Sequence, residues 1–149
     1  MIIVIDALNQ DRFADLLDEM FQLRARVFGD RLGWEVHIEN GREFDQFDDL
    51  NPAYVVGLDE QGHVVACARF LQTTGPHMLS DVFHAILDGQ PPLRSASIWE
   101  STRFCVDTQR LSASDKVGAV SRMTSEIMVA MLEYAKASGI SDIIIFFFR

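Results

Sequence analysis

The stretch VVACARFL, residues 64–71, decides the fold, because it is apolar at almost every position and predicts a strand in the middle of a sheet. A second apolar run, residues 54–58, precedes it and is joined to it by the turn Asp59-Glu60-Gln61-Gly62. Further strands are expected over residues 2–5, 97–106 and 143–148. The first of these is rich in β-branched residues and suits a strand buried on both faces.

Two longer segments have the 3.6-residue period of helices that pack against such a sheet. The first begins near Asn9 as its N-cap. The second is expected from about Asp115 to Ser138, with Gly139 as its stop. A short helix is expected over residues 78–87. The apolar stripes consist of Phe13, Leu16, Leu17, Met20, Val27 and Phe28 in the first segment and of Val117, Val120, Ile127, Met128, Met131 and Leu132 in the second.

Composition places the chain among single globular domains. It has 149 residues, of which 48% are apolar and 23% charged, and the order of its elements predicts one mixed α/β domain over residues 1–149. The net charge of −9 argues against nucleic acid or an anionic membrane as the main partner. We expect a cytoplasmic protein, because the N-terminus lacks a basic region and no apolar run is long enough to span a membrane. Cys67 and Cys105 are expected to be reduced and packed in the interior.

Arg24 lies inside the apolar stripe of the first helix. A buried guanidinium there needs an anionic partner, because an unpaired charge is costly to remove from water. The alternative, which periodicity alone favours, is that its aliphatic part lies along the apolar face and its charged end reaches solvent. The next segment, residues 30–60, holds nine carboxylates against two arginines, interleaved with aromatic residues such as Trp34. That combination suits an organic cation.

SIWESTRF, residues 97–104, contains a glutamate among apolar neighbours. Strict alternation puts Glu100 on one face, and Arg103 on the other with Trp99, Ser101 and Cys105. An unpaired buried glutamate has a raised pKa, so Glu100 is a candidate general base, and the alternative is an ion pair with an arginine on the same or an adjacent strand, Arg103 or Arg69. If Glu100 and Arg103 serve one site, the strand needs a bulge or an end there.

Common catalytic signatures are absent from the sequence: it has no phosphate-binding glycine loop, no H-E-x-x-H and no G-x-S-x-G. Asp81, His84 and Asp88 could share one helical face, but this spacing is a weak indication of a metal, and no metal site is predicted.

Six separated motifs occur in order and at family spacing. They are Arg24-x-x-Val27-Phe28, Arg31-Leu32-x-Trp34, Glu43-x-Asp45-x-x-Asp48, Arg69-Phe70-Leu71-x-Thr73-Thr74-Gly75-Pro76, Met78-Leu79 and Trp99-Glu100-x-x-Arg103-Phe104. In these motifs the chain resembles the acyl-homoserine-lactone synthases of the autoinducer-synthase (LuxI-like) family, from near its N-terminus to about Asp142. The resemblance implies a twisted mixed sheet flanked by helices, like that of the Gcn5-related N-acetyltransferases (GNAT).

The resemblance also implies a reaction. The amine of S-adenosylmethionine attacks an acyl thioester, usually on acyl carrier protein, and the product closes to a lactone and expels methylthioadenosine. S-adenosylmethionine is then a substrate, and no cofactor is expected. By resemblance, the catalytic positions are Glu100, Arg103, Arg69, Asp45 and Asp48, the S-adenosylmethionine-binding positions are Arg24, Phe28, Trp34 and Arg103, and the acyl and oxyanion region contains Phe104, Thr102 and Ile143.

Two other functions stay open: an N-acyltransferase that uses acyl-coenzyme A, and an inactive fragment that binds S-adenosylmethionine. Members of the family continue beyond the strand at Ile143, so the resemblance implies that this chain is shortened at its C-terminus. From that expectation follows another, that the chain associates with itself through the apolar strand at residues 143–148.

Overall fold

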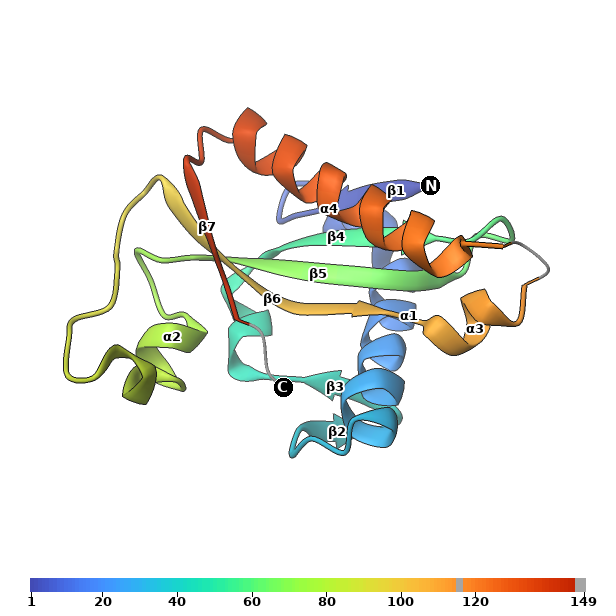
Figure 1. The fold of residues 1–149 in the computed structure, drawn as a ribbon, viewed down its shortest axis with the longest axis horizontal. Coiled ribbons are helices and arrows are strands. Elements are labelled where there is room, and N and C mark those ends of the chain that lie inside the picture. Colours follow the sequence, from blue (N-terminus) through green and yellow to red (C-terminus); the bar gives the residue numbers. More distant parts are fainter. Residues whose placement is uncertain (115–116, 147–149) are drawn as a thin grey trace.

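The computed structural model describes residues 1–114 and 117–146. Five strands form the main sheet in the order β1-β4-β5-β6-β7, antiparallel except for the parallel pair β6 and β7 (Figure 1). Their bounds are Ile2–Ile5 for β1, Ala53–Leu58 for β4, Val64–Gln72 for β5, Ile98–Val106 for β6 and Asp142–Ile145 for β7. All five strands lie where the sequence predicts them, except that β7 ends at Ile145 and does not include Phe146.

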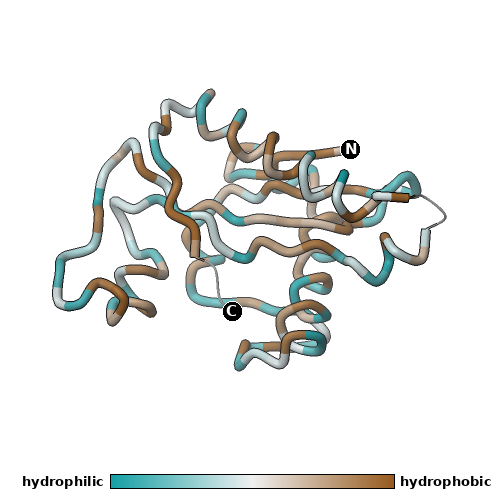
Figure 2. The backbone as a smooth tube through the Cα atoms, viewed as in Figure 1, coloured by the Kyte–Doolittle hydropathy of each residue, from teal (hydrophilic) through white to brown (hydrophobic). Residues whose placement is uncertain are grey.

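The middle strand of the sheet is β5, as predicted, and it is buried from Val64 to Leu71. Helix α1, Ala14–Arg24, covers one face and helix α4, Ala119–Ala137, covers the other. Successive side chains of β4 point to opposite faces of the sheet, since Val56 packs in the core under α1 and Val55 in the core under α4. Apolar residues run along the strands, and hydrophilic residues gather in the loops (Figure 2).

The prediction that the first strand is buried on both faces was wrong. Within the described residues β1 pairs only with β4, so it forms an edge of the sheet. Only Ile5 of this strand is fully buried, because an edge strand has no neighbour to cover its outer side. At the opposite edge, β7 pairs with β6. The predicted self-association of residues 143–148 stays a prediction, and residues 147 and 148 lie outside the described ranges.

The first helical segment has three parts. A 3₁₀ turn at Gln10–Phe13 leads into α1, and a π-helical turn at Ala25–Arg31 follows it. The side chain of Asn9 does not cap the segment as predicted. Its Oδ1 instead accepts a hydrogen bond from the Asp6 N–H at 2.9 Å, and its Nδ2 donates to the Val4 carbonyl at 3.0 Å.

The last helix begins at Ala119, later than predicted, and Asp115 lies outside the described residues. A separate short helix, α3 at Thr108–Ser112, precedes it and was not predicted. Gly139 follows α4 with a φ of +79°, a left-handed conformation suited to glycine, as expected for a helix stop. The buried stripe of α4 is Met123, Ile127, Met131 and Ala135, whereas the predicted stripe members Val117, Met128 and Leu132 are exposed.

The remaining elements lie at one end of the sheet and beside the first helical segment (Figure 1). They are the hairpin of β2, His37–Glu39, and β3, Arg42–Phe44, a 3₁₀ turn at Gln46–Leu50, helix α2 at Met78–Asp81 and a 3₁₀ turn at His84–Leu87. The last two replace the single short helix expected over residues 78–87. Among the described residues, no helix is long and apolar enough to cross a membrane.

Candidate active site

A bulge in β6 determines how the site is assembled. Cys67 of β5 lies opposite Cys105, but Arg69 lies opposite Thr102, so β6 contains one more residue than β5 between these pairs. Arg103 lies in the bulge with a φ of +53°, in the left-handed region.

The bulge overrides strict alternation and brings the two predicted residues of β6 to one place. Cys105 belongs to the core under α1, and not to the face of Trp99 as predicted. Glu100 and Arg103 both reach Met78: the Met78 N–H donates to Glu100 Oε1 at 2.7 Å, and the Arg103 guanidinium lies 3.9 Å from Met78 Sδ. The strand therefore contains the bulge that was predicted to be needed if Glu100 and Arg103 serve one site, and that they do so stays a prediction.

Three arginines and three carboxylates form a buried cluster of balanced charge, which we call the ion-pair cluster. Its members are Arg24, Arg69, Arg103, Glu43, Asp45 and Asp48. The side chain of Arg24 is 0% exposed, contacts Glu43 at 2.5 Å and donates two hydrogen bonds of 2.8 Å to Asp48. The expectation that the charged end of Arg24 reaches solvent was therefore wrong, because two carboxylates enclose it in the interior.

The other two arginines extend the cluster to β5 and β6. Arg69 holds both oxygens of Asp45, at 2.5 and 2.8 Å, and its Nε donates to Thr102 Oγ1 at 3.0 Å. Arg103 pairs with Glu43 at 2.7 Å and with Asp45 at 3.1 Å. The guanidinium of Arg103 also lies over the ring of Phe28, 5.5 Å from its centre. The five predicted members of the cluster are thus brought together.

Asp48 is the most heavily bonded carboxylate of the cluster. Besides Arg24 it accepts hydrogen bonds from Arg69 at 2.9 Å and from the Tyr54 hydroxyl at 2.7 Å. Burial opposes its charge, but the hydrogen bonds and charge of Arg24, helped by Arg69, outweigh burial and hold the pKa of Asp48 well below its ordinary range. Burial, together with the neighbouring carboxylate, raises the pKa of Tyr54.

Sequence reasoning did not select Glu43 and Tyr54 as functional residues. Glu43 is part of the Glu43-x-Asp45-x-x-Asp48 motif. It is fully buried and pairs with two arginines, so it belongs to the ion-pair cluster as much as the two aspartates of that motif do. Tyr54 is one of the aromatic residues interleaved with the carboxylates of residues 30–60, but a tyrosine at the start of a strand is common, and it was not selected.

Glu100 is 0% exposed and takes part in neither predicted ion pair. Its oxygens accept hydrogen bonds from the backbone N–H groups of Met78, at 2.7 Å, and Leu79, at 2.8 Å. Burial raises the pKa of Glu100, in opposition to these two hydrogen bonds. The carboxylate therefore anchors the first turn of α2 to the sheet, and its predicted role as general base stays a prediction.

Two cavities meet beside the cluster. The first, of about 470 Å³, is lined by Phe28, Trp34, Asp45, Thr102 and Arg103, and also by Met78 and Phe83 from α2 and the residues after it. Phe28 and Trp34 stack with ring centres 5.2 Å apart, and Trp34 is 40% exposed. This cavity therefore combines aromatic surface with a carboxylate and a guanidinium.

The second cavity, of about 480 Å³, lies between α4 and β6 and has a largely apolar lining. Its walls include the predicted residues Phe104 and Ile143. The two cavities have six described lining residues in common: Phe28, Trp34, Ser101, Phe104, Ile145 and Phe146. They are neighbouring compartments that share one wall.

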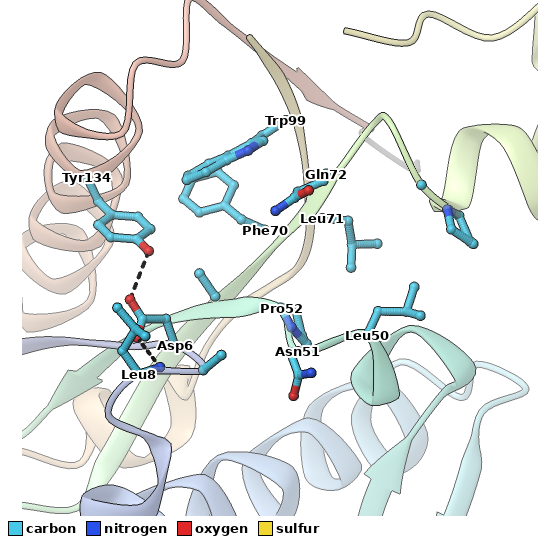
Figure 3. A pocket seen from close by; sticks show the side chains of 14 residues that line it. Asp6, Leu8, Leu50, Asn51, Pro52, Phe70, Leu71, Gln72, Trp99 and Tyr134 are labelled. Carbon is cyan, nitrogen blue, oxygen red and sulfur yellow. Dashed lines mark hydrogen bonds between the residues drawn. The ribbon is translucent and has the colours of Figure 1, made fainter. Parts of the chain in front are cut away.

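A third cavity, of about 450 Å³, lies elsewhere (Figure 3). Aromatic residues Phe70, Trp99 and Tyr134 line it, and the Tyr134 hydroxyl donates to Asp6 at 3.3 Å. None of the predicted site residues lines this cavity. Across the described residues, no group of three or more His, Cys, Asp or Glu side chains is placed to hold a metal ion.

The chain is similar to several known proteins. The chain matches the family model described as autoinducer synthase over residues 8–147. A protein of Sinorhizobium fredii described as a probable acyl-homoserine-lactone synthase is 40% identical over 131 residues, 88% of this chain. The solved AHL synthase LasI has a TM-score of 0.81 and 33% identity, covering 97% of this chain and 70% of that one.

A second solved structure is the CoA-dependent acyl-homoserine lactone synthase BjaI with SAM and isopentyl-CoA. It has a TM-score of 0.82 and 30% identity, and the match covers 96% of this chain and 64% of that one. The mixed sheet flanked by helices is thus the GNAT-like fold of these synthases, as the sequence predicted. The chain spans 62% of the length of the Sinorhizobium fredii relative.

Proposed function

The chain belongs to the autoinducer synthase family, and from this membership we propose that it is an acyltransferase that converts S-adenosylmethionine and an acyl thioester into an acyl-homoserine lactone. The observation that carries the proposal is the shared wall of the two cavities beside the ion-pair cluster. One compartment suits a cationic amino acid and the other suits an acyl chain, so their reacting ends would meet at that wall.

S-adenosylmethionine is assigned to the first cavity. Its sulfonium and ammonium groups fit a site made of Phe28, Trp34 and the Asp45 carboxylate. Its carboxylate needs a cationic donor, and Arg103 lines the cavity with one guanidinium nitrogen facing Met78 Sδ at 3.9 Å. Arg24 is enclosed by Glu43 and Asp48 and lines neither cavity, so we assign it to positioning the cluster rather than to binding.

The acyl chain is assigned to the second cavity, whose apolar walls between α4 and β6 exclude water from a hydrocarbon tail. The donor is a thioester of a phosphopantetheine arm, which both acyl carrier protein and coenzyme A carry. We propose acyl carrier protein. The CoA dependence of BjaI makes acyl-coenzyme A the donor to compare with it.

The chemistry has two steps. The neutral amine of S-adenosylmethionine attacks the thioester carbon, a C–N bond forms, the C–S bond breaks, and the amine proton leaves through a base while the sulfur departs as a thiol. The methionine carboxylate then attacks its own γ-carbon. A C–O bond forms, the C–S bond to the sulfonium breaks, and methylthioadenosine leaves as a neutral thioether. The negative charge of the carboxylate and the positive charge of the sulfonium cancel in this closure.

A product assay tests the proposal. Folded protein is mixed with S-adenosylmethionine and octanoyl donors on acyl carrier protein or coenzyme A, and mass spectrometry follows methylthioadenosine and octanoyl-homoserine lactone. Both products in equal amounts are expected. Acylation of another amine without methylthioadenosine would indicate an ordinary N-acyltransferase. Binding of S-adenosylmethionine without product would indicate a non-catalytic binding protein.

A further inference from the structure

The hydroxyl of Ser101 is buried and has no hydrogen-bond partner within residues 1–114 and 117–146. Ser101 is 4% exposed and lies in the middle of β6. Buried polar groups nearly always have a partner, and a hydroxyl left without one costs the free energy of removing it from water. If packing alone determined the residue at this position, an alanine would destabilise the fold less than a serine does. The hydroxyl therefore needs an explanation outside the packing of the sheet.

The position of Ser101 in the strand supplies that explanation. Ser101 is the last residue of β6 in register with β7, opposite Ile145. Just beyond it β6 bulges at Arg103, and the two cavities share the wall at this point. Among the described residues common to both linings, Ser101 carries the only hydroxyl. An acceptor on a molecule that extends from one cavity into the other would reach it.

Neighbouring hydroxyls are engaged elsewhere. Thr102, which the sequence placed in the oxyanion region, lines only the first cavity, and its oxygen accepts a hydrogen bond from Arg69 at 3.0 Å. Thr124 of α4 lines the second cavity, and its hydroxyl donates to the Val120 carbonyl at 2.8 Å. Thr108, at the far end of the second lining, accepts a hydrogen bond from Arg31 at 2.7 Å. Among the described residues of the two linings, Ser101 thus has the only hydroxyl that forms no hydrogen bond.

We propose that Ser101 donates a hydrogen bond to the carbonyl oxygen of the acyl thioester and is a catalytic residue of the acyl transfer. The inference rests on the proposed function. When the amine nitrogen bonds to the carbonyl carbon, the C=O π electrons move to the oxygen, and the Ser101 hydroxyl stabilises the resulting oxyanion. When that intermediate collapses, the C=O bond returns, the C–S bond breaks, and the sulfur leaves as a thiol with the proton from the amine.

Kinetics of Ser101→Ala test the role. Removing one donor to an oxyanion lowers kcat by about 10²-fold, so we expect a fall of that order with an unchanged KM for S-adenosylmethionine. The melting temperature should be the same or higher, because the variant also removes an unpaired buried hydroxyl. The pair Ser101→Thr and Ser101→Val has matched volume, and we expect only the threonine variant to keep activity. A wild-type rate in Ser101→Ala or Ser101→Val would overturn the inference.

Infrared spectroscopy gives a readout that needs no turnover. Octanoyl-pantetheine with a ¹³C-labelled carbonyl is bound to the wild type, to Ser101→Ala and to Thr124→Ala. We expect a lower carbonyl stretching frequency in the wild type and in Thr124→Ala than in Ser101→Ala. The same frequency in all three proteins, or no binding of the thioester to the wild type, would overturn the inference. A shift that depends on Ser101 without any lactone would contradict the proposed function alone.

Discussion

Arg24 and Asp48 are joined by two parallel hydrogen bonds of 2.8 Å each, in the interior of the protein and between segments that lie far apart in the sequence. Such a pair does not stabilise the fold as much as its short distances suggest, because both charges were first removed from water. Its energetic weight appears when one partner is taken away, since the other charge is then buried without compensation.

Asp48→Asn is therefore expected to lower the free energy of unfolding by about 3–5 kcal/mol. The change leaves Arg24 and Arg69 each short of a carboxylate and alters the partner of Tyr54. Denaturant unfolding measures the loss. The matched control is Asp49→Asn at the exposed neighbouring position, expected within about 0.5 kcal/mol of the wild type. Equal effects of the two variants would contradict the structural role of Asp48.

The lowered pKa of Asp48 predicts a loss of stability in acid. Because the folded protein holds this carboxylate charged more strongly than the unfolded chain does, its contribution is complete above the ordinary pKa of 3.8 and is lost as the pH falls below that value. The stability difference between wild type and Asp48→Asn should shrink in that window. Unfolding free energies measured from pH 6 down to the acid limit test this, and a constant difference would refute it.

Glu100→Gln should lower both stability and activity. An amide in place of the carboxylate turns an N–H group toward the N–H of Met78 or Leu79, so one hydrogen bond is lost and α2 loosens. We expect a cost of about 1–3 kcal/mol for the unsatisfied group, together with a lower kcat. The control is Glu126→Gln on α4. A normal melting temperature with complete loss of kcat would instead favour Glu100 as the base and speak against anchoring as its main contribution.

Arg103→Lys tests the binding of S-adenosylmethionine. Lysine keeps the charge but loses the planar group that bridges Glu43 and Asp45 and lies over Phe28. The dissociation constant of S-adenosylmethionine, measured by calorimetry, should rise about tenfold or more, which corresponds to one charged hydrogen bond. Arg26→Lys, at a half-exposed surface pair with Asp107, is the control and should bind as the wild type does.

Val120→Trp should shorten the acyl chains that the protein accepts. Val120 lines the second cavity, and each methylene kept out of an apolar site forfeits about 0.8 kcal/mol, or roughly fourfold in kcat/KM for each methylene. Competition between butanoyl and decanoyl donors measures the effect. The control is Val129→Trp, because Val129 lies on the same helix and is 52% exposed. An unchanged chain-length preference in Val120→Trp would contradict the assignment of the acyl chain to this cavity.

Hydrophobic periodicity was enough to locate all five strands of the main sheet, because burial of β5 leaves little choice of residue from Val64 to Leu71. It could not place β1 at an edge, since the β-branched run at Ile2–Ile5 reads the same in a central strand. Periodicity also could not locate the start of α4. Val117 fits the apolar stripe in the sequence, but tertiary packing leaves it exposed.

For the site, the family motifs contain all six charges of the ion-pair cluster, but only five of them were predicted as site residues, and periodicity alone misplaced Arg24. The position of Arg24 in the apolar stripe predicts that its side chain starts at the core. It does not predict which carboxylates pair with the guanidinium, and these belong to β3 and to the 3₁₀ turn that follows β3. The Ser101 hydroxyl could not have been found from sequence, because what distinguishes it is the lack of a partner among the described residues together with its place in the linings of two cavities.

The ion-pair cluster also limits how this protein can change over evolutionary time. Each carboxylate in it serves two arginines, and each arginine at least two carboxylates, so reversing any one charge removes attraction from several neighbours at once. A single compensating exchange cannot restore the balance. Variation should therefore accumulate on the walls of the second cavity, where apolar side chains can be exchanged singly, while the six charged positions are inherited as one unit.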